Sequence, residues 1–284
     1  MKCAQERTAQ SIGFGIRAFN LIELLVVIAI VAVLAVMSLP AHATAKTRAQ
    51  QASCYNNFRQ LQLCWLLYSD AHADKLVPNH SSGVGASRTA VSAHPYTWVL
   101  GNAYTDTSTT NIESGRLYPY NRSVGIYKCP ADRSTVMDRG QIPRSRSVSM
   151  SLYMNWDDNP GSEYPYCWHT RSQIVAPSKA AVFVDEHENS IAQCAFFINN
   201  PNPAPYPLNL LGLGFWTWVS FPAVRHNNGC NLSFADGHVE TWHWQEPNTA
   251  AIGASGPWLF IRPAVPGTAR DLTRFFGAVP AQAP

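Results

Sequence analysis

The sequence lacks the short motifs that usually carry enzymatic chemistry. It contains no Gly-x-Ser-x-Gly elbow, no His-Glu-x-x-His pair and no glycine-rich phosphate loop. A hydrolase that uses a histidine base with a serine or cysteine nucleophile therefore has little support. We expect no enzymatic activity.

Charged residues are also scarce, and neither sign dominates. They make up 14% of the chain, and the formal net charge is only +3. Part of this excess lies in the first 18 residues, which hold Lys2, Arg7 and Arg17 against Glu6. Because a nucleic-acid-binding domain normally carries a strongly basic surface, we expect no nucleic-acid partner.

Apolar residues, in contrast, are abundant and form one long run. They make up 46% of the 284 residues, which is enough for one compact domain in addition to an N-terminal segment. The run is FNLIELLVVIAIVAVLAVMSL, residues 19–39. As a helix it would extend about 31 Å, which matches the hydrocarbon core of a bilayer. With basic residues before it, the run predicts a single-pass inner-membrane protein, with a cytoplasmic N-terminus and an extracytoplasmic globular part.

One carboxylate, Glu23, lies near the start of this run. A carboxylate in lipid costs about 2–3 kcal/mol, so it indicates either a partner or a side chain that reaches the interface. A cleaved secretory signal is the alternative, since Ala41-His42-Ala43 has the small residues of a cleavage site. The apolar core is longer than such a signal needs.

The string AFNLIELL, from Ala18 to Leu25, resembles the cleavage and methylation motif of type IV prepilins. In that family a peptidase cuts after the small residue and methylates the new terminal amine, here that of Phe19. The resemblance implies that Glu23 pairs with the terminal amine of a neighbouring subunit. It also implies three partners: a prepilin peptidase and methylase, other pilin-like subunits and the inner membrane. Ala18 stands where glycine is usual.

After the apolar run, apolar residues continue at spacings of three and four, which predicts one helix from Phe19 to about Ala71. The resemblance implies an α+β, pilin-like fold, in which a long helix with a membrane-embedded first half packs on a mostly antiparallel β domain. We expect four parts: a leader at 1–18, a transmembrane half at 19–40, an extramembrane half at 41–75 and a globular domain at 76–284.

The globular part reads as mostly β, because short apolar stretches alternate with Gly, Pro, Asn and Ser. The predicted strands are Tyr96–Leu100, Ala181–Asp185, Ile191–Ile198, Asn231–Ala235 and His238–Trp244. Asp236-Gly237 separates the last two strands, and this dipeptide favours a tight hairpin turn.

Further patches resemble a subfamily of pilin-like proteins that end in a histidine, nine residues and then Asp-Gly. In this chain the motif is His226, residues 227–235 and Asp236-Gly237. The accompanying patches are CYNNFRQLQL at Cys54, YKCPAD at Tyr127, RSVSMSLYMN at Arg146 and APSKAAVFVDEHENSI at Ala176. Because related domains occur in the major pseudopilin of type II secretion, the resemblance implies a structural subunit of a type IV pilus or a secretion-type filament.

Six of the seven cysteines follow the apolar run, and an even number in an exported domain predicts disulfides. We expect a disulfide between Cys54, on the long helix, and Cys129, which precedes Pro130 in a loop. Two buried free thiols are the alternative.

A metal site is a further hypothesis. Asp185, Glu186, His226 and Asp236 are its candidate ligands, and hard oxygen ligands would favour Ca²⁺. The structural alternative needs no cofactor: Asp236 and Gly237 shape a turn, and His226 bonds to a backbone carbonyl.

A second class of function also stays open, namely a membrane-anchored or secreted extracytoplasmic module that binds glycan or peptide without assembling into a filament. Six tryptophans would line its surface: Trp156, Trp168, Trp216, Trp218, Trp242 and Trp244. Packing in a core explains the same residues more simply.

Overall fold

The structure is a computed structural model that describes residues 20–82, 88–156, 166–199, 217–254, 262–263 and 269–279. The chain divides into two compact units, Met1–Lys46 and Thr47–Pro284. Helix α1 (Leu21–Ala71) contributes its first part to the first unit and its last turns to the second. The predicted leader, residues 1–18, lies outside the described residues.

Across the described ranges, no helix combines the length and the apolar character needed to cross a membrane. The predictions of a transmembrane half at 19–40, of a pilin-like fold with a membrane-embedded half-helix and of a single-pass inner-membrane location are therefore wrong.

The second unit is built around a five-stranded sheet, so the fold is α+β. The strand order is β5 (Ala195–Phe196), β3 (Val148–Ser151), β4 (Ala181–Asp185), β8 (Gly229–Phe234) and β9 (Val239–His243). Strands β3 and β5 pair in parallel, and the other pairs are antiparallel. β4 lies at the centre and is buried throughout, as expected for a continuous apolar run with neighbours on both sides.

Shorter elements surround this sheet. The smaller sheets are β1 (Thr135–Val136) with β2 (Arg139–Pro143), and β10 (Arg262–Pro263) with β7 (Thr217–Trp218) and β6 (Ile198–Asn199). The short helices are α2 (Thr110–Glu113), α3 (Arg225–Asn228), α4 (Pro247–Ala254) and α5 (Ala269–Gly277). The described residues also form four 3₁₀ turns, which are η1 (Tyr118–Tyr120), η2 (Val124–Tyr127), η3 (Arg171–Gln173) and η4 (Pro177–Lys179).

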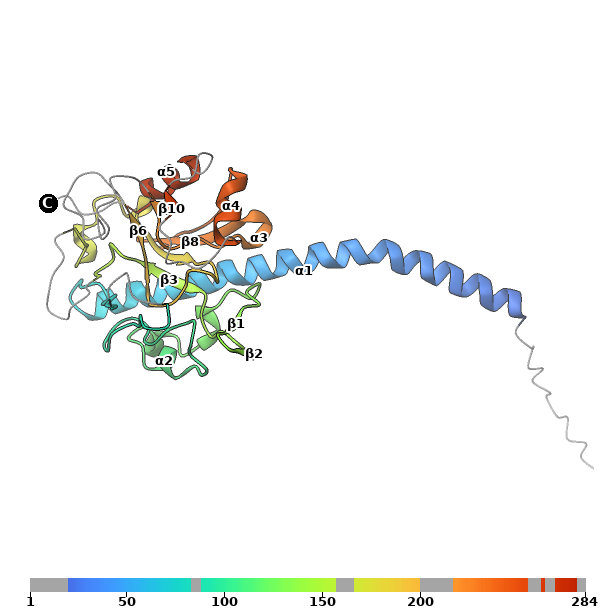
Figure 1. The fold of residues 1–284 in the computed structure, drawn as a ribbon, viewed down its shortest axis with the longest axis horizontal. Helices are drawn as coiled ribbons and strands as arrows, with labels where there is room; N and C mark the ends of the chain where they lie inside the picture. Colours follow the sequence, from blue (N-terminus) through green and yellow to red (C-terminus); the bar gives the residue numbers. More distant parts are fainter. Residues whose placement is uncertain are drawn as a thin grey trace, which may run out of the picture. The chain divides into compact units, whose positions relative to one another are not determined.

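The last turns of α1 lie in the core of the second unit, where Trp65 is fully buried. On one side of the helix, the Tyr55 hydroxyl donates to the carbonyl of Val239 on β9 at 2.9 Å. On another side, the Asn57 amide donates to the carbonyl of Lys128 at 3.2 Å. This part of α1 therefore lies between the central sheet and the segment that carries α2, β1 and β2 (Figure 1).

Aromatic side chains form a second layer of the core. The Phe275 ring of α5 lies 5.2 Å from the ring of Phe196, 5.1 Å from that of Trp218 and 6.2 Å from that of Trp242. Five of the six tryptophans considered for a binding surface are buried: Trp156, Trp168, Trp218, Trp242 and Trp244. They pack in the core and line no binding surface, while Trp216 lies outside the described residues.

Two of the strand predictions fail for identifiable reasons. Tyr96–Leu100 forms turns and bends, because Tyr96 adopts a positive φ of 73° that interrupts an extended chain. Ile191–Ile198 contains only β5 and the start of β6. The carbonyls of Ala192 and Gln193 each accept a hydrogen bond from the guanidinium of Arg146 at 3.0 Å. These two carbonyls therefore bond to a side chain rather than to a neighbouring strand.

The remaining predicted strands correspond to β4, β8 and β9, and β8 and β9 form an antiparallel hairpin. Gly237 in its turn has a φ of 102°, a conformation that residues with a Cβ rarely adopt. We expect Gly237→Ala to lower the free energy of unfolding by about 1–2 kcal/mol.

Gly140 provides the matched control, because it is exposed, has no positive φ, and an added Cβ would meet no atom within 4 Å. Urea unfolding of both variants measures the difference. Equal stability of the two variants would contradict a turn that depends on the glycine.

Candidate functional sites: an exposed apolar helix and a buried Cys–His–Asp cluster

The first turns of α1 expose a long series of large apolar side chains, with exposed fractions between 48% and 76%. They are Leu21, Ile22, Leu24, Leu25, Val26, Val27, Ile28, Ile30, Val31, Val33 and Leu34. We call residues Leu21–Leu34 the apolar segment. Because monomeric proteins rarely expose large contiguous apolar patches, such a segment marks an interaction surface.

A capping box begins the apolar segment. The backbone N–H of Asn20 donates to Oε2 of Glu23 at 3.1 Å, and the backbone N–H of Ile22 donates to the Asn20 side-chain oxygen at 3.4 Å. The first helical bond runs from the Leu24 N–H to the Asn20 carbonyl at 3.1 Å. Asn20 is therefore the N-cap residue and Glu23 the third helical residue. A carboxylate at this position accepts from a backbone N–H that has no helical partner, and the positive N-terminal end of the helix dipole stabilises its charge.

The predicted processing site falls just before this box. Ala18 and Phe19 lie outside the described residues, so their predicted roles stay predictions. The pairing of Glu23 with a neighbouring amine also stays a prediction, since the structure describes a single chain.

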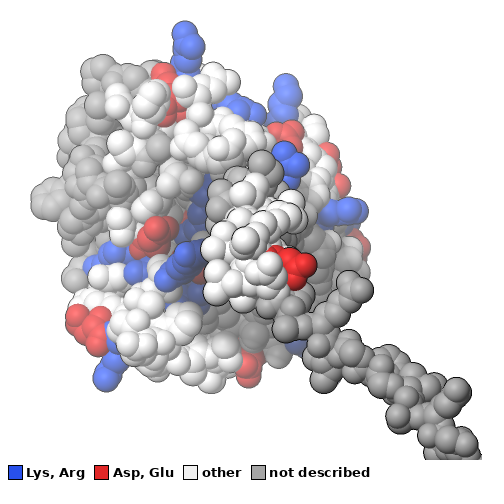
Figure 2. Space-filling model, turned by 90° about the vertical axis from the view of Figure 1, so that its right-hand side faces the viewer, with Lys and Arg blue, Asp and Glu red and all other residues white. Residues whose placement is uncertain are grey.

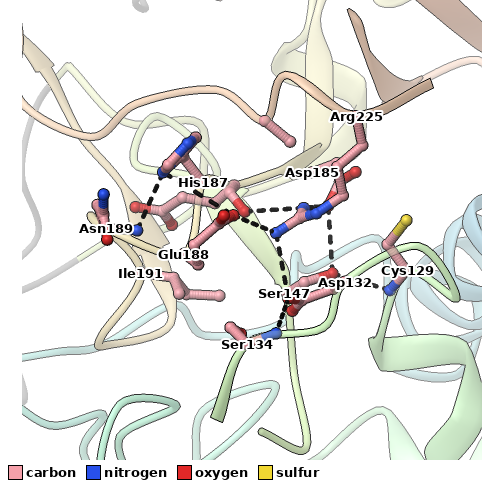
Figure 3. A network of polar contacts seen from close by, with 12 residues as sticks. Cys129, Asp132, Ser134, Ser147, Asp185, His187, Glu188, Asn189, Ile191 and Arg225 are labelled. Carbon is pink, nitrogen blue, oxygen red and sulfur yellow. Dashed lines mark hydrogen bonds and ion pairs between the residues drawn. The ribbon is translucent and has the colours of Figure 1, made fainter. Parts of the chain in front are cut away.

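A second site lies at the end of the central strand β4. The apolar run of β4 ends at Asp185, which is fully buried. Its Oδ1 accepts from Arg225 Nη1 at 2.7 Å and from the Ser147 hydroxyl at 3.2 Å. Ser147 also accepts from the backbone N–H of Cys129 at 2.8 Å, so β4 is joined to the loop that carries Cys129. Figure 3 shows this chain of contacts.

Arg225 is the centre of the charge network. Besides Asp185, its guanidinium contacts Glu188 Oε2 at 2.9 Å and Asp132 Oδ1 at 3.5 Å (Figure 3). The side chains of Arg225 and Asp132 are 9% and 2% exposed, whereas that of Glu188 is 41% exposed. One cation therefore contacts two buried carboxylates and one at the rim.

Burial shifts the pKa values of this network. Burial raises the pKa of Asp185 to about 6, and Arg225 only partly offsets this effect. Burial alone would lower the pKa of Arg225, but Asp185 and Asp132 outweigh burial and raise it. The guanidinium therefore remains charged, while the Asp185 carboxyl is in a costly environment.

An unusual backbone conformation brings the side chain of His226 close to Asp185. His226, Asn227 and Asn228 have consecutive positive φ values of 56°, 61° and 61°. Left-handed residues cost roughly 1–2 kcal/mol each, less for Asn, so this turn depends on support from its surroundings. The imidazole is buried, and burial followed by the charge of Arg225 lowers the pKa of His226 to about 4. It is therefore neutral at physiological pH.

Two cysteines complete a cluster with these residues. The Cys129 sulfur lies 3.1 Å from Nε2 of His226. One ligand atom from each of Cys54, Cys129, Asp185 and His226 lies within 4.8 Å of the other three. We call these four residues the buried cluster. Its members come from α1, the loop after η2, β4 and α3, and all four are buried.

The predicted Cys54–Cys129 disulfide is not formed in the structure, where both residues are free thiols. Both are buried, so the structure has the alternative, two buried free thiols. The hydrogen bond with Cys129, followed by burial, raises the pKa of the Cys54 thiol, so this sulfur stays protonated in the absence of a cation.

Two of the four predicted metal ligands do not join the buried cluster. Glu186 follows Asp185 directly and bonds elsewhere, accepting from the Ser190 hydroxyl at 2.8 Å, and burial raises its pKa to about 7. Asp236 lies in the β8–β9 turn and accepts from the backbone N–H of His238 at 3.1 Å. Asp185 and His226 are thus brought together, whereas Glu186 and Asp236 are not.

Arg225, Asp132 and Ser147 have roles that the sequence reasoning missed. Arg225 precedes the noted His226, and Asp132 ends the noted YKCPAD patch. The available indications in the sequence were a cation next to the candidate ligand His226 and an acid three residues after Cys129.

Figure 2 shows charged side chains of both signs on one face of the molecule. Lys and Arg side chains are interspersed there with Asp and Glu side chains.

Searches against models of protein families, curated proteins and solved structures find no match to this chain.

Proposed function

We propose that this chain is a structural subunit of a filament, cut between Ala18 and Phe19 and assembled through α1. The observation that carries the proposal is the apolar segment, whose side chains are exposed over several consecutive helical turns. A surface of this kind needs a cover, and copies of the same helix have a matching apolar character.

Magnitudes support self-association. Full burial of one Val, Leu or Ile side chain contributes roughly 1.5–3 kcal/mol, so burying half of the apolar segment contributes on the order of 10 kcal/mol. Association costs an estimated 4–15 kcal/mol in lost translational and rotational freedom. Each subunit in a filament contacts several others, so contacts to successive neighbours add to the first.

The resemblance of AFNLIELL to the prepilin motif supports the choice of a filament over a closed oligomer. Cleavage before Phe19 by a prepilin peptidase would place a terminal amine just before the capping box. Glu23 would then accept from the amine of a neighbouring subunit, and this charge-assisted bond would select the register of the packed helices.

The test separates the two roles of Glu23, helix cap and charge partner. Glutamine also serves at the third position of a capping box, so Glu23→Gln keeps the cap and removes the charge. We expect Glu23→Gln to reduce incorporation into filaments at least tenfold, since hydrogen bonds to charged groups contribute about 1.5–3 kcal/mol.

The measurement is the yield of sedimentable filaments after coexpression with a prepilin peptidase, with the N-terminus read by mass spectrometry. Glu23→Ala removes both the cap and the charge and is the comparison. Normal incorporation of both variants would refute assembly through Glu23, and an uncut Met1 terminus would refute processing.

A further inference from the structure

We propose that the buried cluster binds one zinc ion through Cys54, Cys129, Asp185 and His226. The four ligand atoms converge from four separate elements to within 4.8 Å of one another. Zinc holds sulfur at about 2.3 Å and nitrogen at about 2.0–2.1 Å, so its ligand atoms lie about 3.3–3.8 Å apart. Side-chain adjustments of about an ångström bring the cluster to this geometry.

The donor set selects the type of metal. Two thiolates and an imidazole are ligands for zinc and other transition metals, whereas calcium takes six to eight oxygens. The cluster offers only the Asp185 carboxylate as an oxygen donor. The calcium expectation therefore does not fit these four residues, and zinc does.

The charges around the cluster also suit a dication. Two thiolates and the Asp185 carboxylate would carry three negative charges, of which zinc would offset two, and Arg225, which also contacts Asp132 and Glu188, lies against the third. Arg225 bonds to Oδ1 of Asp185 at 2.7 Å, while Oδ2 is buried and has no hydrogen-bond partner. A metal at Oδ2 would satisfy this atom, and Arg225 with Ser147 would orient the carboxylate from behind.

A Cys54–Cys129 disulfide is the competing state of the two sulfurs. A disulfide would not explain why His226 also lies here, with its Nε2 atom 3.1 Å from the Cys129 sulfur. This position of His226 requires a left-handed turn of non-glycine residues. The disulfide would also leave Oδ2 of Asp185 without a partner. All four ligands belong to the second unit, so the ion would join the last turns of α1 to the central sheet.

The experiment measures metal in the full chain, purified without chelator and without a metal-affinity resin. Elemental mass spectrometry is expected to find about one zinc ion per chain, as in a closed structural site. Replacing zinc by cobalt(II) is expected to produce the sulfur-to-metal charge-transfer band and the visible absorption of a tetrahedral thiolate site. Both measurements use the unaltered protein, so they do not depend on a variant that folds.

Cys54→Ser and His226→Ala are expected to retain less than about a tenth of the zinc, because each removes a ligand from a four-coordinate site. Cys230→Ser is the matched control. Cys230 is fully buried on β8 but does not belong to the buried cluster, so its zinc content is expected to equal that of the unaltered chain.

Three results would overturn the proposal. They are a chain without zinc that also gives no cobalt spectrum, a non-reduced peptide that links Cys54 to Cys129 in the purified protein, and zinc that the Cys54 and His226 variants retain in full.

Discussion

Arg225→Met lowers the free energy of unfolding by about 3–5 kcal/mol, the expected result of removing one partner from a buried ion pair. Asp185 is fully buried, and Arg225 is its only cationic contact among the ion pairs of the described residues. In the metal-free chain, loss of the guanidinium forces Asp185 either to carry an unpaired charge or to bind a proton. Asp132, at 2% side-chain exposure, loses a cationic partner at the same time.

The same guanidinium provides its own control. Glu188 contacts Arg225 at 2.9 Å, but its side chain is 41% exposed. Solvent screens such a rim contact, so Glu188→Gln is expected to lower stability by less than about 1 kcal/mol. The two variants thus remove the centre and the edge of one network.

Urea unfolding of the metal-free chain at neutral pH measures both variants, and Asp185→Asn, alone and in the Arg225→Met background, completes a double-mutant cycle. The double variant is expected to be more stable than Arg225→Met alone, because the isolated charge is gone. If Arg225→Met falls within 1 kcal/mol of the unaltered chain, the network is not a stabilising one.

Local sequence patterns predict local structure well in this chain, so strand β4 and the turn between β8 and β9 could be predicted from the sequence. The apolar run Ala181–Asp185 corresponds to β4, and Asp236-Gly237 marks the turn between β8 and β9. Both features depend on neighbouring residues only. The strand prediction at Tyr96 failed because the local pattern does not report a positive φ.

The buried cluster is harder to predict, because it depends on contacts between distant parts of the chain. Cys54 and His226 are separated by most of the sequence, and only the pairing of β4 with β8 and the packing of α1 bring them together. The prediction that Asp185 and Glu186 bind the same ion was avoidable. Asp185 and Glu186 are adjacent on an extended chain, so their side chains point in opposite directions and were poor candidates for one shared ion.

The apolar segment yields the last prediction, which concerns association. Ile28→Asp, at the middle of the segment, is expected to weaken self-association at least 100-fold, since burying a charge without a partner costs several kcal/mol. Ile28 is 57% exposed, so the substitution disturbs little within the chain itself.

Leu63 offers a matched control on the same helix. It is 55% exposed and lies in the second unit, outside the apolar segment. Leu63→Asp adds the same charge to a side chain of similar size and exposure. An exposed substitution away from a contact usually changes a free energy by no more than about 0.5 kcal/mol. For the association constant, this corresponds to a factor of about two.

Sedimentation velocity over a range of concentrations measures association of each processed chain, and circular dichroism verifies that the helix content is unchanged. Equal weakening by both substitutions would mean that added charge, rather than the position on α1, controls association. Weakening by Ile28→Asp alone assigns the contact to the apolar segment, because the two substitutions differ only in which part of α1 carries the charge.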